Sequence, residues 1–433
     1  MNKKTILTHA TVITVNGQNE VISDGAVGYE GSVITYVGPT PEDLSGYDEV
    51  IDLKGNYLLP GLVNTHGHVG MSLLRGYADD LPLQQWLEDK MWPLEAQFTS
   101  DHVKWGTYIS LIEMIRTGTT TFVDMYDHMD EVAKAVEASG MRARLCRGMI
   151  GLCSEEERAA KLRESVAFAR NWHNQADGRI TVMMAPHAPY TCPPSFISQI
   201  VDKAEELDLP IHIHMSETAW EVGQNVKDYG VRPVAHLENL GVFNRPTLLA
   251  HAVHLTDEEI DVLANYQVKV SHNVVSNLKL ASGVAPVPKM LAKGISVSLG
   301  TDSSASNNNL NLFEELKLAA ILHKGVNHDP VAVPADAALR MATRYGADGV
   351  FQAESLGSIE VGKQADLIVL NSHQAHFHPA HDPVSHVVYA ANGRDVTDTI
   401  VAGSFLMRNG ELLTVDEERA IYEVNRMFQQ LNR

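Results

Sequence analysis

The sequence predicts an α/β protein, a (β/α)₈ TIM barrel with a small β-sandwich domain built from both chain ends. Two observations lead to this prediction. Short apolar strands alternate with amphipathic helical segments through the middle of the chain, and β-rich segments of similar character flank them on both sides. The length of 433 residues also suits one large domain and a smaller one.

Eight apolar runs in the middle of the chain have the length and composition of parallel strands. They cover residues 57–66, 120–125, 143–149, 180–187, 210–217, 247–253, 267–272 and 296–302. Segments with helical spacing follow most of them; residues 101–118, for example, predict a helix that Gly118 ends. An open, doubly wound sheet is the alternative, but no G-x-G-x-x-G motif follows an early strand.

Both chain ends contain short apolar runs with Gly or Asn at the turns, and a helix is predicted over residues 416–431. The runs cover residues 6–15, 26–38, 355–370 and 398–413. Because the two sets are alike, we expect them to pair into one sandwich. The expected domains are a composite β-sandwich of residues 1–55 and 352–433 and a catalytic barrel of residues 56–351.

Composition excludes several classes of protein. The chain has 34 Lys and Arg against 54 Asp and Glu, a formal charge of −20, which argues against nucleic acid and anionic membranes as partners. It contains no apolar run of the roughly 18 residues that a membrane span needs, and its start lacks the apolar core of a signal peptide. Three cysteines without a C-x-x-C pair indicate reduced thiols. We therefore expect a cytoplasmic protein with a small-molecule partner; a homo-oligomer is compatible with such a barrel.

Three of the predicted strands end in residues that bind metals. His66 and His68 end the first strand, His214 ends the fifth, and Asp302 closes the eighth. Because reactive side chains of a barrel lie at the carboxyl ends of its strands, this set suits a catalytic Zn²⁺ or Fe²⁺ site with an open position. Taken alone, the H-x-H motif is equally compatible with two polar turn residues. His212, one pleat deeper, fits a packed histidine behind the ligands better than a ligand.

A metal-activated water also needs groups that move its proton. Glu217 follows His214 where the fifth strand leaves the barrel, and it suits this role; the competing interpretation is a helix-start carboxylate that faces solvent. His251, from the next strand, could orient the same water, and Asp302 could accept its proton. His254 lies farther along the chain, which favours a structural role.

The motifs PGLVNTHGH, HIHMSET, HAVH and GTDS together resemble the amidohydrolase superfamily, in particular its adenine-type aminohydrolase branch. KQADLIVL and IVAGSFLMRNG look like the returning sandwich strands of that superfamily. Many relatives with two metals carry a carboxylated lysine at the end of strand four, where this chain reads ITVMMAPHAPY. The resemblance therefore implies a single divalent metal, expected to be Zn²⁺ with Fe²⁺ as the alternative.

Within that branch, residues 79–98, 276–287 and 306–316 look like the 5-methylthioadenosine/S-adenosylhomocysteine deaminase family. This resemblance implies hydrolytic deamination at adenine C6 of such nucleosides, with adenosine as a further candidate, to an inosine-type product and ammonia. It also implies a set of substrate contacts. Glu95 is expected on the ribose hydroxyls, Arg147 on the sugar or the amino-acid tail, and His187 on the adenine ring. Trp86 is expected along the pocket wall, and Glu217 and Asp302 at the reacting end of the substrate.

Without the resemblance, Glu95 and Arg147 would be taken as surface ion-pair residues, Trp86 as core and His187 as a polar strand end. One departure concerns a loop, because relatives commonly read H-N-P where this chain has Val274 after His-Asn, which puts the rigidity of that loop in doubt. The nearest rival functions are amidohydrolases that act on guanine, cytosine or a chlorotriazine. A non-catalytic barrel protein would be expected to have lost ligands, and this chain keeps them.

Overall fold

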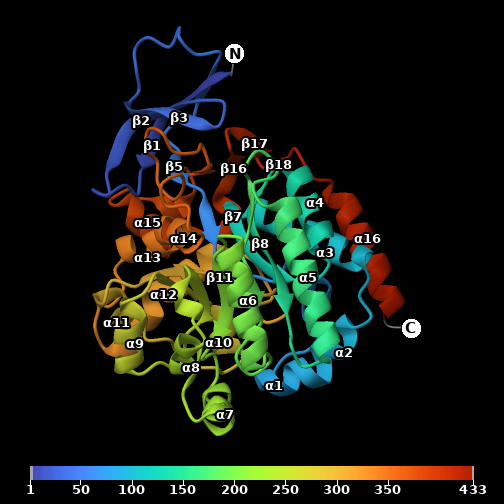
Figure 1. Cartoon of the computed structure of the whole chain (residues 1–433). Helices are drawn as coiled ribbons and strands as arrows, with labels where there is room; N and C mark the ends of the chain where they lie inside the picture. The colour runs from blue at the N-terminus through green and yellow to red at the C-terminus, as the bar shows by residue number, and fades with distance from the viewer. Residues whose placement is uncertain (1–2, 432–433) are drawn as a thin grey trace.

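Eight parallel strands with helices around them form the larger part of the molecule (Figure 1). The computed structural model describes residues 3–431, and every element named here lies within that range. The barrel strands are β6 (Leu62–Asn64), β7 (Thr119–Tyr126), β8 (Arg142–Met149), β9 (Ile180–Val182) with β10 (Ala185–Pro186), β11 (Ile211–Met215), β12 (Thr247–His251), β13 (Val268–His272) and β14 (Ser296–Leu299). The fourth strand is thus divided into two pieces, β9 and β10.

Backbone hydrogen bonds close the barrel. Strands β6, β7 and β8 pair in parallel, as do β11 to β14. A parallel bridge joins Met184 to Ile211, and the amide of Thr65 donates to the carbonyl of Leu299 at 2.9 Å. The barrel that the alternating pattern predicts is therefore confirmed.

Helices lie around the barrel and beyond one end of its strands (Figure 1). They are α3 (Ser100–Arg116), α4 (Met129–Ser139), α5 (Glu155–Trp172), α6 (Pro194–Glu206), α7 (Ala219–Tyr229), α8 (Pro233–Asn239), α9 (Asp257–Ala264), α10 (Val274–Lys279), α11 (Val287–Ala292), α12 (Leu312–Asn327), α13 (Ala335–Ala342) and α14 (Arg344–Gly349). Between β6 and α3 the chain forms η1 (Val69–Leu74), α1 (Leu83–Trp86), the π-helical turn η2 (Leu87–Met91) and α2 (Trp92–Glu95). Gly118, at φ +80°, follows the end of α3, as the sequence predicts.

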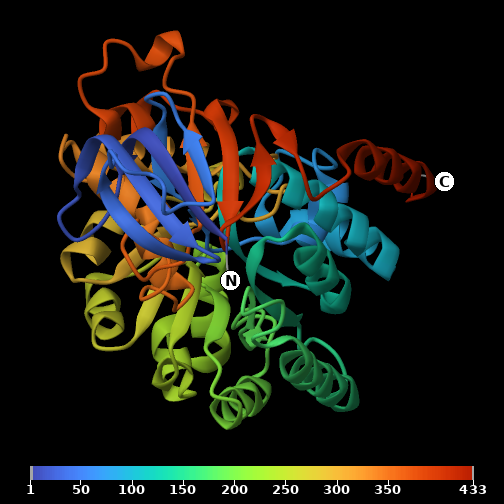
Figure 2. The same cartoon turned by 90° about the horizontal axis from the view of Figure 1, so that it is seen from above.

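The two chain ends build one further sheet. Its strands are β1 (Lys4–Ile13), β2 (Val21–Glu30), β3 (Val33–Pro39), β4 (Glu49–Asp52), β5 (Tyr57–Pro60), β15 (Leu367–Leu370), β16 (Val396–Val401), β17 (Ser404–Arg408) and β18 (Glu411–Leu412). Their order is β18-β17-β16-β15-β5-β1-β2-β3, with β4 beside β1, so strands from the two ends lie side by side (Figure 2). Helices α15 (Pro383–Tyr389) and α16 (Glu417–Leu431) belong to the same C-terminal part of the chain.

The apolar run predicted as one strand over residues 57–66 serves both sheets. Its first half, β5, pairs with β1 and β15, and its second half, β6, pairs with β7 in the barrel. Gly61 lies at the crossing point, where a Cβ atom would stand 2.1 Å from Oγ1 of Thr120. Only glycine allows the backbone to pass so close, because it has no Cβ.

A buried ion pair joins the barrel to the sheet of the chain ends. Arg142, at the start of β8, donates from Nε to Oδ2 of Asp366 at 2.8 Å and from Nη2 to Oδ1 at 3.0 Å. Asp366 lies directly before β15 and also accepts the amide of Ala402 at 2.7 Å. Both charged side chains are buried, so each depends on the other for compensation.

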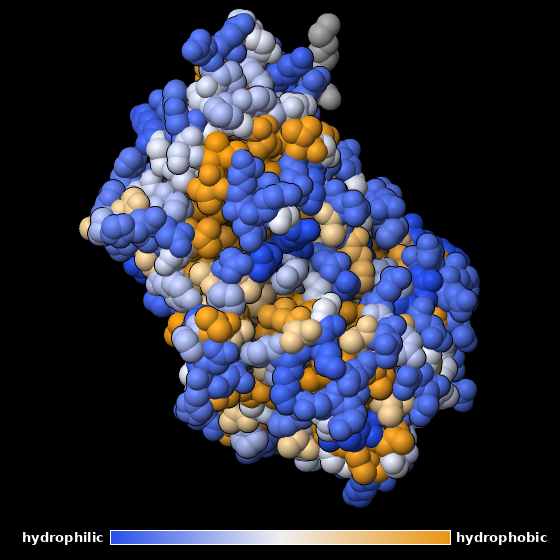
Figure 3. Space-filling view, turned by 90° about the vertical axis from the view of Figure 1, so that its left-hand side faces the viewer, coloured by the Kyte–Doolittle hydropathy of each residue, from blue (hydrophilic) through white to orange (hydrophobic). Residues whose placement is uncertain are grey.

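The outer surface is mostly hydrophilic on the side shown in Figure 3, with apolar side chains gathered in a patch in its upper half. Helix α12, which lies on this side in Figure 1, exposes Ile321 and Val326. The homo-oligomer that is compatible with such a barrel stays a prediction. Among residues 3–431, no helix combines the length and the hydropathy that crossing a membrane requires.

Replacing Asp366 with alanine is expected to lower the free energy of unfolding by about 3–5 kcal/mol, because Arg142 is then left buried without a negatively charged partner. Equilibrium unfolding in guanidinium chloride measures this change. The control is Glu131→Ala, which removes the partner of the exposed Lys134 and should cost less than about 1 kcal/mol. Equal losses in the two variants would contradict the importance of the buried pair.

Candidate active site

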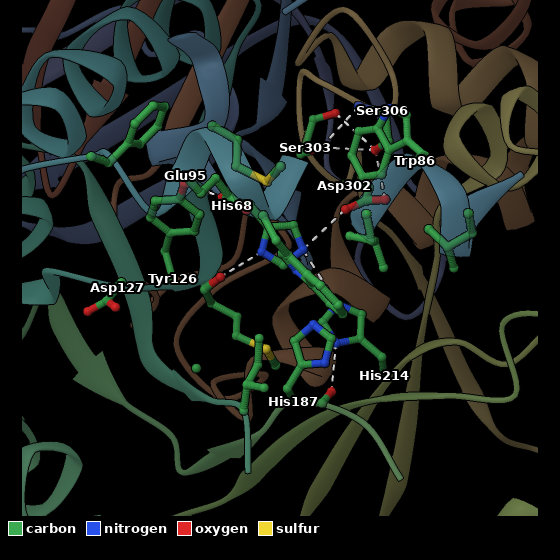
Figure 4. Close-up of a pocket in the computed structure, with 18 of the residues that line it drawn as sticks. His68, Trp86, Glu95, Tyr126, Asp127, His187, His214, Asp302, Ser303 and Ser306 are labelled. Carbon is green, nitrogen blue, oxygen red and sulfur yellow. Dashed lines mark hydrogen bonds and ion pairs between the residues drawn. The ribbon is translucent and has the colours of Figure 1, made fainter. Parts of the chain in front are cut away.

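A cavity of about 470 Å³ lies at the carboxyl ends of the barrel strands. Leu83, Trp86, Leu87 and Trp92, from the helical segment before α3, form an apolar wall. Other lining side chains are polar and end or follow the barrel strands, and Figure 4 shows His68, His187, His214 and Asp302 facing one another there. The cavity therefore combines apolar surface with acid–base groups.

The four predicted metal ligands point toward one another. Nε2 of His68 lies 3.4 Å from Nε2 of His214 and 3.3 Å from Oδ1 of Asp302. Nε2 of His66 lies 3.5 Å from the same carboxylate oxygen. His66 is fully buried behind the cavity wall, whereas the other three residues line the cavity. Three different strand ends thus bring one oxygen and three nitrogens together.

Hydrogen bonds behind the histidines fix which nitrogen of each ring is free. Nδ1 of His68 donates to the carbonyl of Met125 at 2.6 Å, and Nδ1 of His214 donates to the carbonyl of His187 at 2.7 Å. Because a carbonyl only accepts, both Nδ1 atoms carry the hydrogen. The Nε2 atoms that face the cluster are then left with lone pairs, as a metal ligand requires.

His66 is oriented by a second histidine. Nδ1 of His212 donates to the carbonyl of Leu248 at 2.9 Å, so Nε2 of His212 is free to accept. It accepts from Nδ1 of His66 at 2.9 Å, which leaves the lone pair of His66 on Nε2. The position of His212 behind a predicted ligand agrees with the sequence-based interpretation of this residue.

Asp302 and His251 are held by the α10 segment and the loop after β14. Oδ2 of Asp302 accepts the hydroxyls of Ser276 at 2.5 Å and Ser306 at 2.9 Å, so Oδ1 remains directed at the histidines. Nδ1 of His251 lies 2.8 Å from Oδ1 of Asn277, an acceptor, which assigns the hydrogen to Nδ1 and the lone pair to Nε2.

Glu217 enters the same cavity without belonging to the cluster of nitrogen and oxygen ligands. Its Oε2 lies 3.7 Å from Nε2 of His251, and its Oε1 accepts the hydroxyl of Ser282 at 3.5 Å. The carboxyl is buried, and this burial raises its pKa above the usual range. Glu217 therefore faces the cavity rather than solvent, which removes the helix-start interpretation.

The donor set fits a divalent metal ion. Nε2 of His66 is buried and has no hydrogen-bond partner, which is costly unless another group occupies that direction. The ligand atoms of His66, His68 and His214 lie within 4.8 Å of one another, as do those of His66, His251 and Asp302. Imidazole nitrogens combined with one carboxylate are the ligands of catalytic zinc sites.

The expected substrate contacts also line the cavity. Glu95, at the end of α2, accepts the hydroxyl of Tyr126 at 2.5 Å, and burial raises its pKa. Nε1 of Trp86 donates to the carbonyl of Ala78 at 3.0 Å, which holds the indole in place. The ring presents an apolar face to the cavity. Trp86 can therefore line the cavity and still be a buried core residue.

Arg147 and His187 also line the cavity. The guanidinium of Arg147 contacts Asp127 and Glu164, each at 3.2 Å, and both carboxylates are half exposed. His187 is 2.9 Å from Oγ1 of Thr191, and burial lowers its pKa to about 3, so its ring is neutral. The structure thus brings all predicted site residues to one cavity and the cluster behind it, while the roles assigned to them stay predictions.

The sequence does not predict several of the residues that contact the site. Tyr126 could have been found, because it ends a barrel strand as the other site residues do. Ser276, Asn277 and Ser306 lie on connecting segments, and only the folded chain brings them to Asp302 and His251. Nε2 of His272, the last residue of β13, lies 3.1 Å from Nε2 of His323, and His272 does not line the cavity.

These features define a metal-type hydrolase site at the mouth of a barrel. Residues 57–406 match the amidohydrolase family, and the chain belongs to this family. It is 49% identical over 433 residues to a 5-methylthioadenosine/S-adenosylhomocysteine deaminase of Halalkalibacterium halodurans, with 99% of this chain and 98% of that protein covered.

Two solved structures share the complete architecture. An adenosine deaminase from Xanthomonas campestris with bound zinc gives a TM-score of 0.94 at 35% identity and covers 99% of each chain. An atrazine chlorohydrolase from Arthrobacter aurescens TC1 complexed with zinc gives 0.92 at 25% identity, with 98% of this chain and 100% of that chain covered. The same fold thus occurs in proteins named for different substrates.

His212→Phe is expected to weaken zinc binding roughly 10- to 100-fold, because the phenyl ring keeps the packing but cannot accept from Nδ1 of His66. Competition with a chromophoric chelator measures the affinity. His236→Phe is the control, since His236 is also buried but stacks on Tyr229 and is not part of the ligand cluster. Equal zinc affinity in His212→Phe and the unaltered protein would show that this bond does not orient His66.

Proposed function

We propose that the protein catalyses hydrolytic deamination at C6 of adenine nucleosides, with 5-methylthioadenosine and S-adenosylhomocysteine as substrates and adenosine as a further one. The observation that carries the proposal is the composition of one cavity. A ligand cluster, a buried acid outside that cluster and a carboxylate suited to ribose hydroxyls all face the same space. The name of the relative from Halalkalibacterium halodurans supports this choice of substrate.

One divalent metal ion, Zn²⁺ with Fe²⁺ as the alternative, would be held by His66, His68, His214 and Asp302. When bound, it lowers the pKa of a coordinated water toward about 7 and so supplies a nucleophile at neutral pH. At the end of the fourth strand this chain has no lysine that could bind a second metal ion together with the first, which supports a single ion. The zinc in the similar adenosine deaminase agrees with this assignment.

Glu217 would protonate ring N1 of the adenine. Burial raises the pKa of its carboxyl, so Glu217 keeps a proton at a higher pH than an exposed glutamate does. Protonation of N1 makes C6 electrophilic, because the amidine unit of the ring then carries the positive charge. An ordinary amide has no such nitrogen, so this acid selects an amidine-like ring.

Either Asp302 or His251 would take the proton of the attacking water. The free lone pair on Nε2 of His251 points toward Glu217, and the two serine hydroxyls on Asp302 leave its other oxygen available. Attack at C6 forms a tetrahedral centre, and return of the proton to the amino group lets ammonia leave. The product is an inosine-type nucleoside.

The remaining contacts would place the nucleoside. The Glu95 carboxylate can accept from two vicinal hydroxyls; burial raises its pKa, and the Tyr126 hydroxyl bonded to it offsets part of this shift. Neutral His187 can contact the adenine ring, and Trp86 with its apolar neighbours can cover a methylthio group. Arg147 suits a carboxylate tail, which would compete with its present partners Asp127 and Glu164.

A free base or a chlorotriazine is the rival substrate class, because the atrazine chlorohydrolase shares the fold. Glu95 separates the two classes, since a molecule without ribose offers nothing to this carboxylate. A substrate panel with the zinc-reconstituted protein, followed by ultraviolet absorbance, gives the direct comparison. It should contain methylthioadenosine, S-adenosylhomocysteine, adenosine, adenine, guanine, cytosine and a chlorotriazine.

In this panel, Glu95→Gln is expected to lower kcat/KM for methylthioadenosine roughly 10- to 100-fold, because charge-assisted hydrogen bonds to the ribose are lost. Any turnover of a free base should change little. Glu88→Gln is the control, since Glu88 lies in the same segment but is exposed and does not line the cavity. Unchanged methylthioadenosine kinetics in Glu95→Gln, or a preference of the unaltered protein for guanine, cytosine or a chlorotriazine, would overturn the nucleoside assignment.

A further inference from the structure

Helix α7 starts with a sequence pattern that ordinarily serves only as a helix cap. In the pattern S/T-x-x-E, the hydroxyl accepts from the amide of the glutamate and the glutamate carboxylate accepts from the amide of the capping residue. Two other helices of this chain follow this arrangement. Glu157 accepts the amide of Ser154 at 2.8 Å in α5, and Glu259 accepts the amide of Thr256 at 2.9 Å in α9.

Glu221 of α7 departs from it. The amide of Glu221 donates to Oγ1 of Thr218 at 3.1 Å, which is the ordinary half of the cap. Its carboxylate, however, reaches back past Thr218. Oε1 accepts the amide of Ser216 at 2.8 Å, and Oε2 accepts the amide of Glu217 at 2.7 Å. Both oxygens of Glu221 are therefore bound to the backbone that carries the proposed acid.

The backbone at this point is unusual and needs an acceptor. Ser216 has φ +52°, a left-handed conformation that is rare for residues other than glycine. Such a residue turns successive amides toward one side, where they form a concavity that binds an anion. The Glu221 carboxylate fills this concavity. The carbonyl of Ser216 in turn accepts the amides of Val253 at 3.1 Å and His254 at 2.9 Å, directly after β12.

The Glu221 carboxylate is buried at 1% exposure, and backbone amides, in place of a lysine, arginine or histidine, bind both of its oxygens. Burial without a cation raises its pKa to about 7. An exposed cap, such as Glu157 provides, would stabilise the helix end without this cost. The placement therefore indicates a purpose other than capping α7.

We propose that Glu221 is a positioning residue for Glu217. By binding the amides of Ser216 and Glu217, it fixes the backbone from which the Glu217 carboxyl enters the cavity. This inference rests on the proposed function, because it assumes that Glu217 transfers a proton. It adds a residue, outside the cavity wall, that acts on the reaction only through Glu217.

The first test is Glu221→Gln in the full-length, zinc-loaded protein. The glutamine oxygen can accept one amide, but its NH₂ group faces the other, so the Ser216–Glu217 backbone must shift. We expect kcat for methylthioadenosine to fall roughly 10- to 100-fold, as small misplacements of catalytic groups do. Zinc content and the thermal midpoint should remain close to those of the unaltered protein. Glu157→Gln, the matched cap control, should keep the full kcat.

The second test is a double-mutant cycle with Glu217→Gln, which a merely structural role would not pass. If Glu221 acts through Glu217, adding Glu221→Gln to Glu217→Gln should cost almost nothing further. The same fold loss in both backgrounds, or full activity of Glu221→Gln, overturns the inference. Full activity of Glu217→Gln would instead overturn the proposed function.

Should Glu217→Gln be too slow for the cycle, a crystal structure of zinc-loaded Glu221→Gln decides. A displaced Glu217 carboxyl with the zinc ligands in place supports the inference. A Glu217 carboxyl in its original position, combined with reduced kcat, overturns it, because the loss then has another cause.

Discussion

The site depends on one constraint, namely that each ligand histidine must present the same ring nitrogen to a common point. Backbone carbonyls impose this on His68 and His214, and His212 transmits it from the carbonyl of Leu248 to His66. All these carbonyls belong to the barrel strands or to residues directly after them. The closed hydrogen-bonded barrel thus determines the protonation pattern of the cluster, and the cluster needs no flexible loop for its orientation.

A second feature of the site is the backbone conformation at the carboxyl ends of the strands and just beyond them. Ser216, His251 and Asp302 all have left-handed φ angles, at +52°, +75° and +61°. Such conformations cost of order 1 kcal/mol or more each and persist only where surrounding contacts hold them. Here those contacts include Glu221 on Ser216, Asn277 on His251 and the serines on Asp302. The turns direct the side chains inward, where an extended strand would have alternated them.

Much of this arrangement could be predicted from the sequence, for a physical reason. A barrel places strand ends at one mouth, so His66, His68, His214 and Asp302 had to meet once the strands were recognised. The split of residues 57–66 at Gly61 could not be predicted, because both halves are equally apolar and only the approach of Thr120 distinguishes them.

The supporting residues could not be predicted from the sequence, for a different reason. Ser276, Asn277 and Glu221 act through tertiary hydrogen bonds, and their local patterns predict only an ordinary helix or cap. Glu95 and Arg147 were assigned through the family resemblance, since a carboxylate or guanidinium in a connecting segment has no signal of its own. Val274, which stands where relatives commonly have a proline, is the first residue of α10.

The most direct measurement of the central claim is anomalous diffraction at the zinc edge from crystals of the zinc-loaded protein. One peak is predicted, within roughly 2.0–2.2 Å of Nε2 of His66, His68 and His214 and of a carboxylate oxygen of Asp302. The carboxyl of Glu217 should lie outside the coordination sphere. Two peaks, a peak away from these atoms, or Glu217 as a ligand would contradict the account of a single metal with a separate acid beside it.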